Sequence, residues 1–107
     1  MIANIVEWRR MMMRSLEECR QQLDEVDRDI VRLFEQRMMV ARDVARYKIA
    51  HALPVLDQSR EEMVLASRVS MLKDGHFAGS VRALYECIMA LSRQEQEGLL
   101  LEEGKDA

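Results

Sequence analysis

Residues 15–48 read SLEECRQQLDEVDRDIVRLFEQRMMVARDVARYK, and this stretch decides the fold. Its apolar residues recur at intervals of three and four, which is typical of a helix that packs along one side. Ser15 followed by Glu18 is a capping-box start, and no Gly or Pro interrupts the stretch. The pattern therefore predicts a single helix over 15–48, about 51 Å long. The apolar positions are Leu16, Cys19, Leu23, Val26, Ile30, Leu33, Val40, Val44 and Tyr47.

A helix of this length does not fit inside a small single-chain domain. The chain has 107 residues, and a compact chain of that size is only roughly 34 Å across. The part of the helix that extends beyond the globule must bury its apolar side against another surface. An intertwined homodimer is the simplest solution.

Two shorter helices are expected after the long one. Pro54 ends the long helix, because proline cannot continue a helix and disfavours helical geometry in the preceding residue. A second helix begins near Asp57, whose carboxylate suits an N-cap, and ends at the Lys-Asp-Gly of 73–75. A third helix opens at 79–80 and lasts until Gly98. The fold class is therefore all-α.

The chain divides into three segments on this interpretation. We expect an N-terminal extension over 1–14, a helical domain over 15–98 and a polar C-terminal tail over 99–107, frayed from Glu102 onward.

Composition excludes several classes of protein. Four Gly and one Pro are too few for the turns of an all-β sandwich or barrel. A net charge of −3 gives no support for a nucleic-acid partner, and the absence of a long apolar run excludes a membrane span and a secretory signal. Two cysteines far apart suggest neither a disulfide framework nor a metal site, so we expect a protein of the reducing cytoplasm.

Two cations interrupt the apolar side of the long helix. Arg37 lies between Leu33 and Val40, and Lys48 returns to nearly the same face eleven residues later. Their helical neighbours three and four residues away include no acid, and unpaired buried cations are costly unless an anion meets them. Arg42 also lacks an acidic neighbour, but we expect it on the opposite, solvated face.

Polar residues also occupy apolar positions of the two shorter helices. Glu61 heads the apolar side of the second helix, and Ser92 and Gln96 extend that of the third. Arg37 and Lys48 could each pair with an acid such as Glu61 or extend to solvent. Taken together, however, polar groups on the inward faces of three helices suggest the lining of one polar pocket.

Arg20 cannot reach the same ligand as Arg37 on one straight helix. The two lie about 25 Å apart along the axis and about 100° apart around it. If Arg20 contributes to a pocket, it contributes to that of the partner chain; alternatively, Glu17 and Asp24 are both spaced to form surface ion pairs with it.

These residues resemble the pattern of the all-helical class of chorismate mutases. The resemblance spans about 15–96, with one single-residue gap in the loop before the third helix. It rests on Arg20, Leu23-Asp24-x-x-Asp27, Arg37, Lys48, Pro54-Val55-x-Asp57-x-x-Arg60-Glu61 and Ser92-x-x-x-Gln96. It implies three helices from each of two chains, interlocked into a six-helix homodimer with two equivalent pockets. It also implies a substrate, the chorismate dianion, that rearranges to prephenate in tyrosine and phenylalanine biosynthesis without cofactor or metal.

The resemblance also implies a role for each pocket residue. Arg37 and the partner chain's Arg20 would bind carboxylates, and Lys48 would hold a carboxylate and the ether oxygen. Gln96 would donate a hydrogen bond to that same oxygen. The remaining residues would complete the site: Asp57 and Glu61 at the ring hydroxyl, Arg60 and Ser92 in the polar lining. Lys48, Gln96, Arg37 and Glu61 are the residues we expect to carry catalysis.

The chemistry of a concerted rearrangement agrees with this residue set. Such a reaction needs no nucleophile or general base, and His51 and His76 are isolated while neither cysteine has a histidine near it in sequence. It does need a compact substrate conformation and a positive charge at the breaking C–O bond. Two alternatives stay open: an isochorismate–pyruvate lyase of the same fold, and a non-catalytic dimerising or regulatory module of a shikimate-pathway enzyme.

Overall fold

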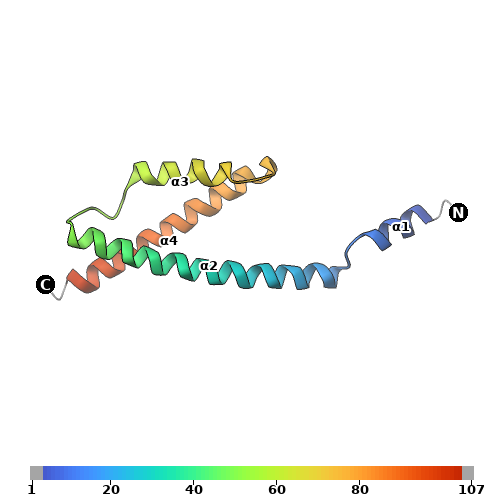
Figure 1. Ribbon diagram of the computed structural model, residues 1–107, viewed down its shortest axis with the longest axis horizontal. Coiled ribbons are helices and arrows are strands. Elements are labelled where there is room, and N and C mark those ends of the chain that lie inside the picture. Colours follow the sequence, from blue (N-terminus) through green and yellow to red (C-terminus); the bar gives the residue numbers. More distant parts are fainter. Residues whose placement is uncertain (1–3, 105–107) are drawn as a thin grey trace. The chain divides into compact units, whose positions relative to one another are not determined.

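The structure is a computed structural model that describes residues 4–104. Its elements are α1 (Asn4–Met12), α2 (Leu16–Ala50), α3 (Gln58–Ser70), the 3-10 helix η1 (Gly75–Phe77) and α4 (Ala78–Gly104) (Figure 1). The described residues contain no strand. The predicted all-α class, with one long and two shorter main helices, is therefore confirmed. Within the described range, no helix has both the length and the apolar character needed to cross a bilayer.

The chain forms two compact units, residues 1–36 and residues 37–107, which we describe separately. In the first unit, the Glu18 N–H donates to the Ser15 Oγ at 3.1 Å, which confirms the predicted start of α2. Helix α1 lies within the segment expected to be a mere extension, and the sequence analysis missed it. Residues 1–3 of that segment lie outside the described residues.

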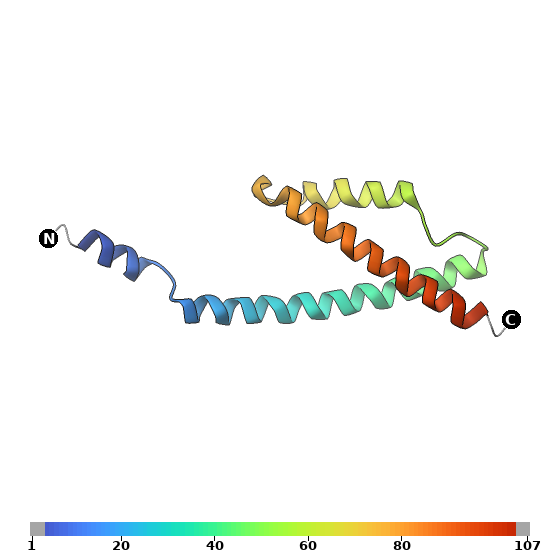
Figure 2. The same cartoon turned by 180° about the vertical axis from the view of Figure 1, so that it is seen from behind.

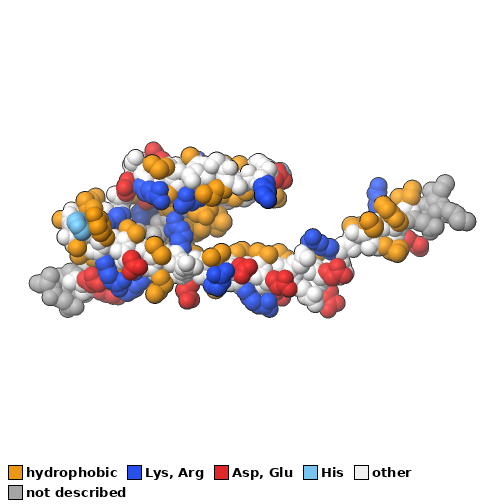
Figure 3. All heavy atoms as spheres, viewed as in Figure 1, with side chains coloured by type: hydrophobic (Ala, Val, Ile, Leu, Met, Phe, Trp, Pro, Cys, Tyr) orange, Lys and Arg blue, Asp and Glu red, His pale blue; other side chains and the backbone are white. Residues whose placement is uncertain are grey.

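The apolar side of α2 in the first unit is exposed in the single chain. Figure 3 shows a row of hydrophobic side chains along this part of the helix. Each of its five main members is between 52% and 65% exposed: Leu16, Leu23, Val26, Ile30 and Leu33. Exposure of this much aligned apolar surface is unusual for a soluble monomer and marks an interaction surface.

A tight turn ends α2 in the second unit. The Leu53 N–H donates to the Lys48 carbonyl at 2.8 Å and the Ala52 N–H to the Ile49 carbonyl at 3.3 Å. This pair of bonds is a Schellman motif, which places its C′ residue in the left-handed region. That residue is Ala52, with φ of 53°, where glycine is usual. The turn directs the chain back toward α3, and the break predicted at 51–54 is confirmed.

Helices α3 and α4 pack against each other around a small apolar core, and η1 joins them (Figures 1 and 2). The Asp57 carboxylate accepts a hydrogen bond from the Arg60 N–H at 3.0 Å, which confirms Asp57 as the N-cap of α3. Val64 and Leu65 of α3 and Met89 of α4 form the buried cluster, with Tyr85 packed against it. This contact joins the middle of α3 to α4.

The third main helix is longer than predicted. It does not end at Gly98 but continues to Gly104, so the expectation of a frayed tail from Glu102 is wrong for residues 102–104. Leu99 is only 3% exposed, and Glu103 forms an ion pair with Arg46 of α2 at 3.5 Å. Burial of Leu99 outweighs the cost of about 1 kcal/mol for a glycine inside a helix. Residues 105–107 lie outside the described residues.

The C-terminal part of α2 crosses α4. Ala41 and Ala45, one turn apart, are the buried residues of α2. Arg42 pairs with Glu95 of α4 at 2.6 Å, and this hydrogen bond raises the pKa of the Arg42 guanidinium. The expectation that Arg42 is simply solvated is therefore wrong, because its acidic partner comes from a helix distant in sequence.

Substitution of Ala52 by glycine should stabilise the protein. A non-glycine residue in the left-handed region costs about 1–2 kcal/mol, and glycine loses part of that gain through backbone entropy. We expect Ala52→Gly to raise the free energy of unfolding by about 0.5–1 kcal/mol, measured by urea unfolding at a fixed chain concentration.

The matched control is Ala66→Gly, the same change at an exposed position inside α3. It should lower the free energy of unfolding by about 0.5–1 kcal/mol. A loss of stability in Ala52→Gly as well would show that the left-handed geometry carries no cost at this turn.

Candidate active site

A pocket of about 290 Å³ lies within the second unit, between α2, α3 and α4. Seven of the eight residues predicted for a site line it: Arg37, Lys48, Asp57, Arg60, Glu61, Ser92 and Gln96. Its other lining residues are Val40, Ala41, Val44, Val55, Val64, Met89 and Arg93. Residues spread over 60 positions of sequence, from 37 to 96, thus meet around one cavity, which supports the prediction of a single polar pocket.

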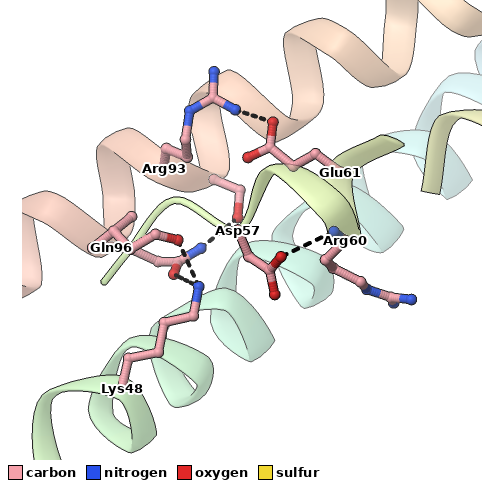
Figure 4. A network of polar contacts seen from close by, with 8 residues as sticks. Lys48, Asp57, Arg60, Glu61, Arg93 and Gln96 are labelled. Atoms are coloured by element: carbon pink, nitrogen blue, oxygen red, sulfur yellow. Dashed lines mark hydrogen bonds and ion pairs between the residues drawn. The ribbon is translucent and has the colours of Figure 1, made fainter. Parts of the chain in front are cut away.

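Lys48 is held in place by two acceptors. Its Nζ donates to the Val55 carbonyl at 2.6 Å and to the Gln96 Oε1 at 3.3 Å (Figure 4). The turn after α2 explains the first contact, because it returns the chain so that Val55 passes the ammonium. A lysine ammonium has three N–H donors, so one donor is left for a ligand.

Gln96 and Ser92 form a buried polar pair on α4. They are 7% and 8% exposed, and the Gln96 Nε2 donates to the Ser92 Oγ at 3.1 Å. The four-residue spacing puts both side chains on one face of the helix. Because Lys48 takes the amide oxygen and Ser92 one N–H, Gln96 has a fixed orientation with its second N–H available to a ligand.

Glu61 is paired with a residue that the sequence analysis missed. The Arg93 guanidinium donates to the Glu61 Oε1 across the contact of α4 with α3 (Figure 4). Arg93 is 32 residues away in sequence, so helical spacing within one element could not reveal it. The one sequence signal for Arg93 is that it directly follows Ser92, a residue already predicted to line the pocket.

Asp57 and Arg60 lie at the start of α3. The Asp57 carboxylate caps the helix through the Arg60 N–H, while the Arg60 side chain is exposed and makes only a long contact of 3.9 Å with the Met63 sulfur. Asp57 therefore has a structural role whether or not it also meets a ligand.

Three pocket cations lack a carboxylate partner among the described residues. Arg37, Lys48 and Arg60 take part in none of the ion pairs of residues 4–104. The alternative that Arg37 or Lys48 pairs with Glu61 does not hold in the structure, because Glu61 pairs with Arg93. The lining thus has four cations and two carboxylates, a formal charge of +2 that suits a dianion.

Arg20 is the predicted site residue that does not line this pocket. It lies on α2 in the first unit and is exposed. Neither Glu17 nor Asp24 forms an ion pair with it in the described part of the chain. Its predicted role in a partner's site therefore stays a prediction.

The pocket offers donors rather than nucleophiles. Its lining contains no Cys or His, and its only hydroxyl, on Ser92, accepts a hydrogen bond from Gln96. Among residues 4–104, no group of three or more Cys, His, Asp and Glu side chains is arranged to hold a metal ion. Cationic and amide N–H groups that converge on one cavity are suited to bind carboxylates and to stabilise negative charge on oxygen.

Comparison with known families agrees with this geometry. A family model described as chorismate mutase type II matches residues 19–97, and this range includes every lining residue of the pocket. The chain belongs to the chorismate mutase type II family. Arg20 also falls within the matched range, whereas α1 lies before it.

Two curated proteins are similar to part of the chain. It is 36% identical over 53 residues to a chorismate mutase of Methanocaldococcus jannaschii, covering 50% of this chain and 54% of that protein. It is 32% identical over 56 residues to the T-protein of Haemophilus influenzae, covering 52% of this chain and 15% of that protein. The match thus spans about half of the first relative and a small part of the second. No solved structure matches the chain significantly.

Asp57 should be replaceable by asparagine, but not by alanine, without loss of stability. Asparagine caps a helix about as well as aspartate, whereas loss of a cap costs about 1 kcal/mol. We expect Asp57→Ala to lower the free energy of unfolding by about that amount and Asp57→Asn to leave it nearly unchanged, measured by urea unfolding. Equal destabilisation by both changes would contradict the capping role of the carboxylate.

Proposed function

We propose that this protein is a chorismate mutase, an isomerase that converts chorismate to prephenate without a cofactor. The observation that carries the proposal is that seven residues of the family pattern line one cavity with a formal charge of +2. Membership of the chorismate mutase type II family supports the assignment, as does the similarity to a protein named chorismate mutase.

The first task of the site is to hold the substrate in a compact conformation. Chorismate carries two carboxylates, one on the ring and one on the enolpyruvyl side chain. Arg37, unpaired in the described chain, and the partner's Arg20 bind these carboxylates. A guanidinium binds a carboxylate through two parallel hydrogen bonds. Fixing both ends of the substrate brings the reacting carbons together and removes much of the entropic barrier.

The second task is to stabilise the charge that forms on the ether oxygen as the C–O bond breaks. The Lys48 Nζ lies 3.3 Å from the Gln96 Oε1, and each of the two side chains has one N–H donor left for a ligand. The Lys48 ammonium supplies positive charge and the Gln96 amide a neutral hydrogen bond to the same oxygen. Since both side chains are already fixed by protein contacts, they need little reorganisation during the reaction.

The remaining pocket residues bind the rest of the substrate. Glu61 accepts a hydrogen bond from the ring hydroxyl. Asp57, the N-cap of α3, lies beside the same hydroxyl. Arg60 and Ser92 complete the polar lining.

Cys19 and Cys87 are both free thiols, which fits our proposal that the protein acts in the cytoplasm.

We also propose that two copies of the chain interlock into a six-helix homodimer. The exposed apolar row of α2 in the first unit needs a covering surface, and a second copy supplies one of matching length. In that dimer, Arg20 of each chain completes the pocket of the other.

The pure protein should consume chorismate and form prephenate, and Lys48→Ala should remove that activity while the fold persists. Loss of one preorganised donor costs about 10²–10³ in rate. Chorismate absorbance and a chemical assay for prephenate measure the reaction, and circular dichroism reports the fold.

Lys73→Ala is the matched control, because Lys73 is an exposed lysine outside the pocket; its rate should equal that of the unmodified protein. No prephenate from the unmodified protein would contradict the proposed function. Faster turnover of isochorismate to pyruvate would favour the lyase instead.

A mixture of two inactive variants should recover activity if Arg20 serves the partner's pocket. We expect Arg20→Ala and Lys48→Ala each to lose at least about 100-fold in rate. After subunit exchange, about half of the dimers contain one chain of each kind, and each of these has one intact pocket. The mixture should therefore reach about a quarter of the unmodified rate per chain.

The control mixture combines Arg37→Ala with Lys48→Ala. Both of these residues line the pocket of their own chain, so neither pocket of a mixed dimer is intact and no recovery is expected. If the Arg20→Ala mixture also stays inactive after exchange, confirmed by mass spectrometry of differently tagged chains, Arg20 does not act across the dimer.

A further inference from the structure

Arg93 is the charged pocket residue that the family pattern quoted above does not contain. It comes from α4, directly after Ser92, and its guanidinium pairs with Glu61 of α3. The two side chains are 32% and 23% exposed, so the pair lies at the wall of the cavity rather than on the open surface. An ion pair in such a place can act on a bound ligand.

The pairing leaves one carboxylate oxygen of Glu61 available. Arg93 contacts the Oε1, and the Oε2 accepts no hydrogen bond from the described residues. A carboxylate on an unrestrained glutamate side chain samples several rotamers, and fixing it in one of them costs side-chain conformational entropy. Arg93 removes that cost before the substrate binds, because it holds the first oxygen.

We propose that Arg93 is a positioning residue, which orients the Glu61 carboxylate so that its second oxygen accepts the hydrogen bond of the substrate's ring hydroxyl. This inference rests on the proposed function. Arg93 itself does not touch the reacting atoms in this proposal, and its effect passes through Glu61.

Charge balance explains why a carboxylate in this pocket needs such a partner. Glu61 lies in a cavity that is to receive a dianion, and like charges at close range repel. The guanidinium of Arg93 offsets the charge of Glu61, so that Arg37 and the partner's Arg20 remain for the substrate carboxylates and Lys48 for the ether oxygen. This effect applies to any dianion, whereas the orientation of Glu61 matters only to a substrate with a ring hydroxyl.

The alternative is that the ion pair of Arg93 with Glu61 only stabilises the packing of α4 against α3. That contact already contains the buried cluster of Val64, Leu65 and Met89. The ion pair of Arg42 with Glu95 is a purely structural contact of this kind between α2 and α4. The Arg42 Nη1 lies 2.6 Å from the Glu95 Oε1, and the two side chains are 35% and 40% exposed. Arg42 does not line the pocket. Arg42 is therefore the matched control for Arg93.

The test compares chorismate with the analogue in which hydrogen replaces the ring hydroxyl. The kcat/KM for chorismate divided by the kcat/KM for the analogue measures how strongly the site selects for the hydroxyl. A site built to bind a hydroxyl rejects a substrate that lacks it, so this ratio is high when the hydroxyl is bound well. We expect Arg93→Met to lower this ratio at least about tenfold. Arg93→Lys, which restores the positive charge, should recover part of it, and Arg42→Met should leave it unchanged. An unchanged ratio in Arg93→Met overturns the proposal, even if both substrates react more slowly.

Glu61→Gln gives a second arm that does not depend on the folding of the Arg93 variants. Because the effect passes through the Glu61 carboxylate, this change should lower the same ratio, and Arg93→Met added to it should lower the ratio by less than about twofold more. If Glu61→Gln has the same ratio as the unmodified protein, the proposal is overturned. If the unmodified protein does not turn over chorismate, the proposed function fails and this inference with it; normal turnover with an unchanged ratio rejects only the role of Arg93.

Discussion

The hydrogen bonds of the Lys48 ammonium connect the three segments that build the pocket. One bond holds the loop before α3 through the Val55 carbonyl, and the other holds α4 through Gln96. The backbone of the same residue is fixed as well, because the Lys48 carbonyl accepts the Leu53 N–H in the turn that ends α2. A change in this turn would shift the ammonium, the cap of α3 at Asp57 and the adjoining wall of the pocket together.

Local patterns were sufficient to predict the main helices and most of the pocket. The spacing of apolar residues indicated α2, and polar residues at apolar positions pointed to Arg37, Lys48, Glu61, Ser92 and Gln96, which all line one cavity. This worked because a polar group on an inward helix face is costly unless it has a partner. The resemblance to a known family added Asp57 and Arg60, whose sequence positions at a helix start do not reveal a ligand site by themselves.

The features that were missed depend on contacts between residues distant in sequence. Arg93 and Arg42 find their acidic partners on other helices, and no spacing rule within one helix predicts such a pair. Helix α4 passes Gly98 because Leu99 is buried by tertiary packing, which overrides the weak helix propensity of glycine. Arg20 does not line the pocket of its own chain, so neither the pattern nor the fold of one chain decides the role proposed for it.

The exposed row of hydrophobic side chains on α2 has a thermodynamic consequence. In the homodimer that we propose, this surface is covered only after two chains meet, so association contributes directly to the free energy of folding. By mass action, the midpoint of thermal unfolding then rises with chain concentration. Dilution would lower stability and activity together, because in the proposed dimer the same encounter would bury Leu23 and Ile30 and bring Arg20 to the other chain's pocket. Protein abundance would thereby set not only the amount of this enzyme but also the fraction of its chains that are able to work.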